Sequence, residues 1–395
     1  MSFFRRYFSK NLGGDKELSK IKKLLQQGEI DKGSEAIELY LGKEELAVEK
    51  RVKCQQLLAK KLLIQSEYEE AFKEAKKVFS QSQKLSLFSF SLESLIIIIE
   101  YLRTKSDVTK CVNYLEQGKK ILSQMDARKG TILTEGEAIL SYLQGLVSID
   151  KGEIDEGLEY YQRSLEYRKK LGDSASIADV LLKIGTAYNV KGNIELSQEN
   201  FHKSLEIMER IVKIEGKEKL LLCLGNSYNL KSDSKKALFF YKKALAISKE
   251  LGNKEYIAKS KNNIGVIYLD RSEFDLALDY FFETLELAEQ LNHKMLMAAA
   301  VCNIGDIYQS KGELELALEY TKRGLLIREK DLKNNEYIAE SYRTLGLIYQ
   351  EKGDPTKALQ YLLKSLKINE EVGNQSFIVD SLLYLFLLSL DTENI

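Results

Sequence analysis

The sequence predicts an all-α protein built from stacked pairs of antiparallel helices. From residue 145 onward, glycine recurs at intervals of 40 or 41 residues, at Gly145, Gly185, Gly225, Gly265, Gly305 and Gly346. Tyrosine follows three residues after five of these glycines, at Tyr188, Tyr228, Tyr268, Tyr308 and Tyr349. So regular a spacing indicates a repeated structural unit. A single proline in 395 residues and abundant Lys, Glu, Leu and Ile favour helices over Pro-rich linkers.

The stretch Ile257–Leu285 shows what one unit contains. A first helical run carries Gly265 and Tyr268 on one face and ends at a polar break, residues 270–273. A second run follows, with Ala277 as its small residue. Small residues allow two antiparallel helices to approach closely, and the larger apolar side chains fill the space beside them. One unit is therefore expected to be a helical hairpin.

This unit resembles the tetratricopeptide repeat, whose signature places a small residue and a tyrosine in the first helix and alanine and an aromatic residue in the second. The 40-residue period is longer than the usual period of about 34 residues. A glycine after a leucine- or valine-ended second helix, as at Gly172, Gly252 and Gly373, is typical of a left-handed C-cap and allows that helix to be longer. In this respect the chain is similar to kinesin light chains and Leu-Gly-Asn polarity adaptors. The resemblance implies a right-handed α-α superhelix of about nine hairpins plus a terminal helix, with first helices lining a concave groove.

We expect four segments along the chain. Residues 1–14 form an aromatic and basic N-terminal segment, residues 15–135 degenerate repeats, residues 136–375 six clear repeats, and residues 376–395 an apolar capping helix. The degenerate repeats keep small residues where the clear repeats have them, at Ala59, Ala71, Cys111 and Gly118. Between the third and fourth units the spacing stretches, and we expect any hinge to lie within Met125–Gly136.

The N-terminal segment has two interpretations. Aromatic residues stand at helical spacing opposite arginine and lysine, at Phe3, Phe4, Tyr7 and Phe8. Such a pattern is typical of an interfacial membrane anchor, although ten residues bind a membrane weakly by themselves. The alternative is a frayed end, or a cap that folds back on the first helix.

Signals near the C-terminus also leave an alternative open. Asp354 followed by Pro355 predicts the start of a second helix, because aspartate caps helices and proline suits their first turn. The terminal helix then carries an unusual number of apolar residues for a cap, among them Leu382, Leu385, Phe386 and Leu388. One hypothesis is a homodimer or partner contact through these residues. The other is that the helix rotates to bury them on its neighbour.

Composition and spacing argue against catalysis and nucleic-acid binding. Lysine plus arginine and aspartate plus glutamate both number 59, so the chain lacks a basic footprint. His202 and His293 lie in different repeats, the four cysteines have no metal or dithiol spacing, and no phosphate-binding loop appears. We therefore expect no enzyme activity, no metal and no cofactor. Reduced cysteines and the lack of a signal or membrane-spanning segment predict a cytoplasmic protein.

The polar residues of the first helices are the candidate binding residues. In the resembled family an asparagine at the place of Asn263 and Asn303 commonly holds the backbone of a ligand, since an amide both donates and accepts. The full set that we assign to the groove is Asn189, Asn226, Asn229, Asn262, Asn263, Asn303, Lys219, Lys259 and Arg343. The alternative is that the asparagines bond across to neighbouring repeats. The basic residues that clamp acidic chaperone tails are absent from their expected places.

These observations predict a non-enzymatic scaffold that binds a peptide or helix of a partner protein in the concave groove. Two alternatives are a peptide-sensing regulator, which needs a distinct N-terminal effector bundle, and a membrane-peripheral assembly factor anchored by Phe3 to Phe8. RNA binding is disfavoured because no basic stripe is present.

Overall fold

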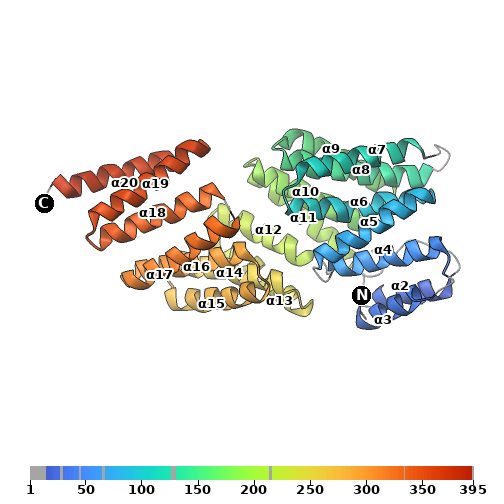
Figure 1. Cartoon of the computed structure of the whole chain (residues 1–395), viewed down its shortest axis with the longest axis horizontal. Helices are drawn as coiled ribbons and strands as arrows, with labels where there is room; N and C mark the ends of the chain where they lie inside the picture. The colour runs from blue at the N-terminus through green and yellow to red at the C-terminus, as the bar shows by residue number, and fades with distance from the viewer. Residues whose placement is uncertain are drawn as a thin grey trace. The chain divides into compact units, whose positions relative to one another are not determined.

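The computed structural model of the chain consists of α-helices joined by short links (Figure 1). It describes residues 15–26, 30–43, 46–64, 67–125, 130–212, 216–332 and 334–393. These ranges contain 19 α-helices, one π-helical turn and no β-strand. Within the described ranges, most helices pack with the next helix of the chain as a hairpin, and a single helix follows the last hairpin. The predicted all-α helical-repeat solenoid is confirmed.

Residues 1–231 form one compact unit, which we call unit 1. Its helices are α2 (Lys16–Gln26), α3 (Ile30–Leu41), α4 (Val48–Ile64), α5 (Tyr68–Lys84), α6 (Phe88–Thr104), α7 (Val108–Ser123), α8 (Gly130–Asp150), α9 (Ile154–Lys170), α10 (Ser174–Val190), α11 (Ile194–Arg210) and α12 (Lys217–Leu230).

Residues 232–395 form the second compact unit, unit 2. Its helices are α13 (Ser234–Glu250), α14 (Lys254–Asp270), α15 (Phe274–Gln290), α16 (Lys294–Ser310), α17 (Leu314–Ile327), the π-helical turn η1 (Arg328–Leu332), α18 (Asn335–Glu351), α19 (Pro355–Val372) and α20 (Gln375–Glu393).

The 40-residue period arises from two 17-residue helices and two three-residue links, as in α9 and α10. At the end of α9, Gly172 has a φ of +66° and the N–H of Asp173 donates to the carbonyl of Arg168 at 3.0 Å. That left-handed residue and that bond define a Schellman motif. The same left-handed conformation recurs along the chain at Ser86, Ser106, Gly152, Gly192, Val212, Ser232, Gly252, Ser272, Asn292, Gly312, Gly353 and Gly373. The extra length over a shorter repeat thus lies in the helices rather than in the links.

The residue after most of these left-handed positions is the N-cap of the next helix. Asn253, for example, accepts a hydrogen bond from the N–H of Tyr256 at 3.3 Å, which satisfies one of the free donors of α14. Asp354 accepts from the N–H of Lys357 at 3.0 Å, and Pro355 is the first residue of α19. The predicted start at these two residues is confirmed.

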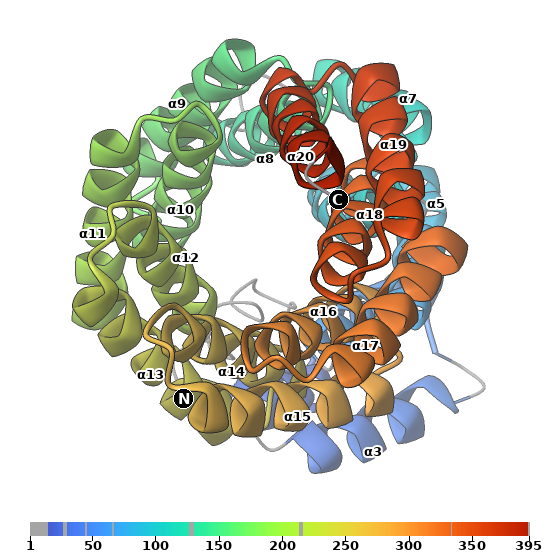
Figure 2. The ribbon, with the colours of Figure 1, turned by 90° about the vertical axis from the view of Figure 1, so that its left-hand side faces the viewer.

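The helices of each unit form two layers. The even-numbered first helices make one layer and the odd-numbered second helices the other, as α14 and α16 against α15 and α17 show in Figure 2. Consecutive first helices contact one another at α4–α6, α6–α8, α10–α12 and α14–α16. Consecutive second helices of the described chain do not contact one another to the same extent. The two layers, which we call the first-helix layer and the second-helix layer, therefore differ in how closely their members approach, with the first helices closer.

The glycine column explains how two helices of a hairpin come together. A Cβ atom at Gly185 would lie 2.6 Å from Cδ1 of Phe201, and one at Gly265 would lie 2.8 Å from Cε1 of Phe281. Both phenylalanine side chains are fully buried. Each glycine thus leaves room for the ring that stands 16 residues later in the second helix. The predicted role of these small residues is confirmed.

In unit 2, each tyrosine of the column stacks on a second tyrosine from the same hairpin. The ring centroids of Tyr308 and Tyr320 are 5.6 Å apart, and those of Tyr349 and Tyr361 are 5.5 Å apart. Stacked aromatic pairs add to the energy of burying the rings. These contacts fix the first and second helices of a hairpin in register and so position the side chains of the first-helix layer.

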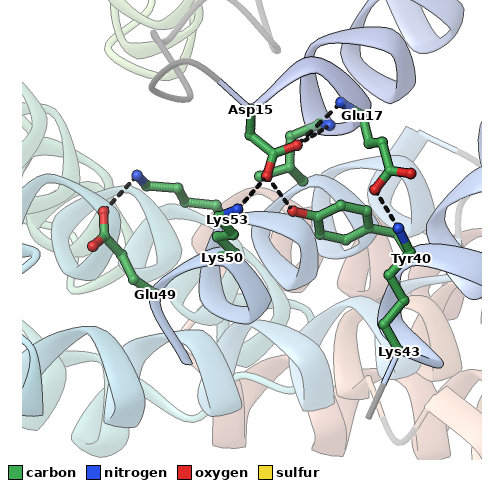
Figure 3. Close-up of polar contacts among 8 residues, drawn as sticks. Asp15, Glu17, Tyr40, Lys43, Glu49, Lys50 and Lys53 are labelled. Atoms are coloured by element: carbon green, nitrogen blue, oxygen red, sulfur yellow. Dashed lines mark hydrogen bonds and ion pairs between the residues drawn. The ribbon is translucent and has the colours of Figure 1, made fainter. Parts of the chain in front are cut away.

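Asp15 organises the start of the described chain (Figure 3). One carboxylate oxygen accepts from the N–H groups of Glu17 and Leu18 at the start of α2, at 3.0 and 3.1 Å. The other accepts from the Tyr40 hydroxyl at 2.8 Å and lies 2.8 Å from the Lys50 ammonium. The Lys50 ammonium holds the pKa of Asp15 well below its usual range. The Asp15 side chain therefore links α2, α3 and α4. The position of Asp15 after two glycines in the sequence does not predict these contacts.

In the described part of the chain, no helix is both long and apolar enough to cross a membrane. The candidate anchor residues Phe3, Phe4, Tyr7 and Phe8 lie outside the described residues.

Candidate functional site

The first-helix layer of unit 1 brings together charged side chains that are far apart in sequence. The Lys183 ammonium on α10 lies 3.6 Å from the Glu100 carboxylate on α6 and 6.0 Å from the centre of the Tyr142 ring on α8. Arg103, also on α6, binds the Asp150 carboxylate of α8 with two bonds of 2.5 and 2.8 Å. Four first helices thus contribute to one polar region when Lys219 of α12 is included.

Lys219 has no partner of its own in this region. It is half-buried, and within unit 1 no described residue forms a hydrogen bond or ion pair with it. The neighbouring Lys183 ammonium and burial lower the pKa of Lys219, against a smaller opposing effect of Glu100. Burial opposes ionisation of Glu100, but Lys183, Lys219 and Arg103 outweigh it and lower the pKa of Glu100. The region therefore holds an ammonium without a partner, beside an ion pair.

Three predicted asparagines lie on the first-helix layer of unit 1. Asn189 on α10 is half-buried, and its side-chain oxygen is buried without a hydrogen-bond donor among the described residues. On α12, Asn226 is exposed and Asn229 is half-buried. The buried side-chain oxygen of Asn189 is therefore an acceptor that the described part of unit 1 leaves unused.

The asparagines of unit 2 interact with each other. The Asn303 amide on α16 donates to the Asn262 oxygen on α14 at 3.5 Å, and the Asn262 amide donates to the Asn263 oxygen at 3.4 Å. Both distances are at the long end for hydrogen bonds. Lys259, one turn before Asn263, binds Glu255 of its own helix and lies 5.0 Å from the Tyr256 ring. The alternative that asparagines bond across to neighbouring repeats is thus confirmed at Asn262 and Asn303, through a long hydrogen bond.

A one-residue irregularity in unit 2 places a buried arginine beside the first-helix layer. The glycine column lengthens from 40 to 41 residues between Gly305 and Gly346, and the helix α17 continues into η1 within this interval. A π-helical turn accommodates one extra residue without breaking the helix. Arg328, the first residue of η1, is 7% exposed.

One guanidinium nitrogen of Arg328 contacts three groups of α18. Its Nη1 donates to the Tyr337 carbonyl at 2.8 Å and to the Ser341 hydroxyl at 2.7 Å. The same nitrogen lies 3.0 Å from the Glu340 carboxylate. The guanidinium therefore neutralises Glu340 and pins the start of α18.

Asp306 on α16 lies close to this group but has no partner. It is half-buried, and no described residue of unit 2 forms a hydrogen bond or ion pair with its carboxylate. Burial and the negative charge of Glu340 raise its pKa to about 6, against smaller opposing effects of Arg328 and Arg343. Arg343 on α18 faces the Tyr384 ring at 5.9 Å, and its buried Nε–H has no acceptor.

Two stretches of the chain, residues 217–290 and 296–371, match the family model described as tetratricopeptide repeat. The chain contains tetratricopeptide repeats. The matched stretches correspond to α12–α15 and α16–α19, four helices each. The sequence as a whole matches no curated protein. The finer likeness to kinesin light chains and Leu-Gly-Asn adaptors remains a prediction.

Solved structures of other proteins with this fold are similar over most of the chain. The APC/C hetero-tetramer Cut9–Hcn1 matches with a TM-score of 0.66 and 16% identity, over 93% of this chain and 62% of that one. A Rap protein complexed with Competence and Sporulation Factor matches with a TM-score of 0.59 and 14% identity, over 87% and 99% of the two chains. The quorum sensor NprR from B. thuringiensis matches with a TM-score of 0.57 and 16% identity, over 87% and 99%. At these identities the likeness shows the fold.

Within the tetratricopeptide units, sequence spacing finds some of the polar residues of the first-helix layer and misses others. The column pattern identifies the asparagines, Lys219 and Arg343, because they fall beside the glycines. It does not identify Glu100 or Arg328, since Glu100 stands in a degenerate repeat and Arg328 stands in a second helix. The 41-residue interval is the one sequence signal that could have pointed to Arg328.

The apolar residues of the terminal helix α20 differ in how far they are buried. Leu382 and Phe386 are 51% and 59% exposed, whereas Leu385 packs against the core of unit 2. Of the predicted set, the Leu388 side chain lies outside the described residues. Leu385 is thus partly buried on a neighbouring helix, as the second hypothesis expects, whereas Leu382 is uncovered, and a homodimer or partner contact through these residues stays a hypothesis.

Proposed function

We propose that the chain is a non-enzymatic scaffold whose first-helix layers bind a peptide or helix of a partner protein. The tetratricopeptide repeat supports a role in protein interaction, and the matched model describes a repeat rather than a catalytic domain. Among proteins of similar fold, a Rap protein has been solved in complex with Competence and Sporulation Factor.

One observation carries the proposal. Half-buried polar groups of the first-helix layers have hydrogen-bonding or charge-pairing capacity that their own unit does not use, notably Asn189, Lys219, Asp306 and Arg343. Charges at the links are paired instead: Lys191 lies 2.5 Å from Asp155, and Lys311 lies 3.3 Å from Asp275. Half-buried polar groups without partners cost folding free energy. A ligand backbone or side chain that supplies the missing partners would recover that cost.

We also propose that the described helices before residue 136 are degenerate units of the same array. Helices α5 and α6 each have 17 residues, as in the matched repeats, and α4–α5 and α6–α7 pair as hairpins. An effector bundle of the kind that a peptide-sensing regulator needs would depart from this pattern. The membrane-peripheral alternative depends on Phe3 to Phe8, which lie outside the described residues.

A pull-down from lysate of the source organism tests the proposed face. We expect wild-type protein to retain a specific partner and the Asn226→Ala, Asn263→Ala, Asn303→Ala triple variant to lose most of it, because the amides no longer hold the ligand backbone. A matched triple variant of exposed amides on second helices, Gln162→Ala, Gln290→Ala, Gln360→Ala, is expected to retain the partner. Equal retention by both variants, with unchanged helicity, would place binding outside the asparagine column.

A further inference from the structure

Asp306 is a half-buried carboxylate to which no described residue of unit 2 forms a hydrogen bond or ion pair. It lies in the last third of α16, a first helix that packs against α14, α15, α17 and η1. From α18 it is faced by Glu340 and Arg343, from η1 by Arg328, and from its own helix by Cys302. On α14, Asn262 bonds to Asn303 of α16. None of these groups forms a hydrogen bond or ion pair with Asp306.

Each arginine near Asp306 is engaged elsewhere. Arg328 is fixed by the Tyr337 carbonyl, the Ser341 hydroxyl and Glu340, with distances of 2.7 to 3.0 Å. Arg343 stacks toward Tyr384 of α20, and its Nε–H lacks an acceptor although it is buried. The chain has therefore placed two guanidinium groups within electrostatic range of Asp306 and has used neither to pair with it.

We propose that Asp306 receives a cationic side chain, lysine or arginine, of a peptide bound to the first-helix layer of unit 2. This inference rests on the proposed function and names the chemistry of its ligand. An ammonium or guanidinium group would give the carboxylate a charge-assisted hydrogen bond, among the strongest polar contacts available. The free Nε–H of Arg343 is then available to a carbonyl oxygen of the same peptide.

The surrounding charges favour a cation over an anion at this place. Glu340 and Asp306 both lie on first helices, and Arg328, the guanidinium that pairs with Glu340, is buried. An acidic side chain entering here would meet Asp306 directly and could reach only Arg343. A basic side chain is attracted by the unpaired carboxylate, so charge complementarity selects the ligand.

Defined peptide pools test the inference. The probes are ten-residue pools, acetylated and amidated at their ends, random except for one fixed central residue: lysine, norleucine, arginine, citrulline or glutamate. On immobilised full-length protein at pH 7.5, we expect lysine and arginine pools to be retained about tenfold better than their neutral isosteres, which is the effect of one charge-assisted contact. The Asp306→Asn variant is expected to lose this preference, and Asp279→Asn, an exposed carboxylate on α15, to keep it.

The outcomes separate this inference from the proposed function. If wild-type protein retains the pools without preferring basic residues, and the asparagine triple variant still reduces retention, the inference is overturned and the scaffold function stands. A preference that survives in Asp306→Asn would assign the cation to another carboxylate and overturn the role of Asp306. Retention of no pool would overturn both. At pH 5 the preference of the wild type should weaken, since Asp306 is then largely protonated and lysine and arginine remain charged.

Discussion

Gly185→Ala is expected to lower the free energy of unfolding of unit 1 by about 1–3 kcal/mol, the usual cost of overpacking a filled core. The added Cβ would lie 2.6 Å from Cδ1 of Phe201 and 3.0 Å from the backbone oxygen of Ser197. Because Phe201 is 1% exposed and the Ser197 oxygen belongs to the α11 backbone, neither can move without separating α10 from α11. Denaturant unfolding followed by circular dichroism measures the change.

A second glycine of unit 1 supplies the control. A Cβ at Gly130, the first residue of α8, would meet nothing within 4 Å. Gly130→Ala is therefore expected to leave stability unchanged or to raise it by up to about 1 kcal/mol through helix propensity. Phe201→Leu in the Gly185→Ala background should restore part of the loss, because the smaller side chain makes room. If Gly185→Ala behaved like Gly130→Ala, the close approach of α10 and α11 would be wrong.

Asp306→Asn is expected to stabilise unit 2 at neutral pH by up to about 3 kcal/mol, since its pKa is raised by about two units and each unit corresponds to about 1.4 kcal/mol. Burial and Glu340 raise the pKa of Asp306 to about 6 in the folded state, from 3.8 in the absence of such effects. A raised carboxyl pKa means that the folded state favours the protonated form. The ionised carboxylate therefore destabilises the fold above pH 6, and this penalty disappears as the pH falls toward 4.

The measurement is the thermal midpoint of wild-type and Asp306→Asn protein between pH 4 and pH 8. The difference should be largest above pH 6 and should be small at pH 4, where the carboxyl is protonated in the folded state and about half protonated in the unfolded state. Asp279→Asn, which removes an exposed carboxylate, is expected to change little at any pH. A loss of stability at pH 7.5 in Asp306→Asn would show that the carboxylate has an internal partner. A gain would mean that this residue is kept at a cost to stability, as binding residues often are.

The fold was predictable because its signals are local and repeated. The glycine and tyrosine columns mark the first helices, and Gly172 and Asp354 mark an end and a start by the conformations that these residues favour. Helix pairing follows from the short links, because a link of three residues brings the next helix back antiparallel beside the one before it. The same sequence pattern occurs in several repeats, so the pattern can still be recognised when one unit is degenerate.

The pairing of side chains was less predictable. Lys183 meets Glu100 across 83 residues of sequence, and this contact depends on how neighbouring first helices are offset. Spacing shows which residues share a layer, but it does not show which charges neutralise each other. Lys259 and Lys219 look equivalent in sequence, yet Lys259 is paired within its helix while Lys219 is not paired within its unit. Unused capacity, on which the binding proposal depends, is a property of packing.

Photo-crosslinking tests the central claim, that the first-helix layers are the binding face, most directly. A benzoylphenylalanine residue replaces Thr186 or Asn303 on first helices, or Gln162 or Gln360 on second helices, and the full-length protein is irradiated in lysate. The account predicts discrete adducts from the two first-helix positions and none from the two second-helix positions. Adducts confined to Gln162 and Gln360 would contradict it.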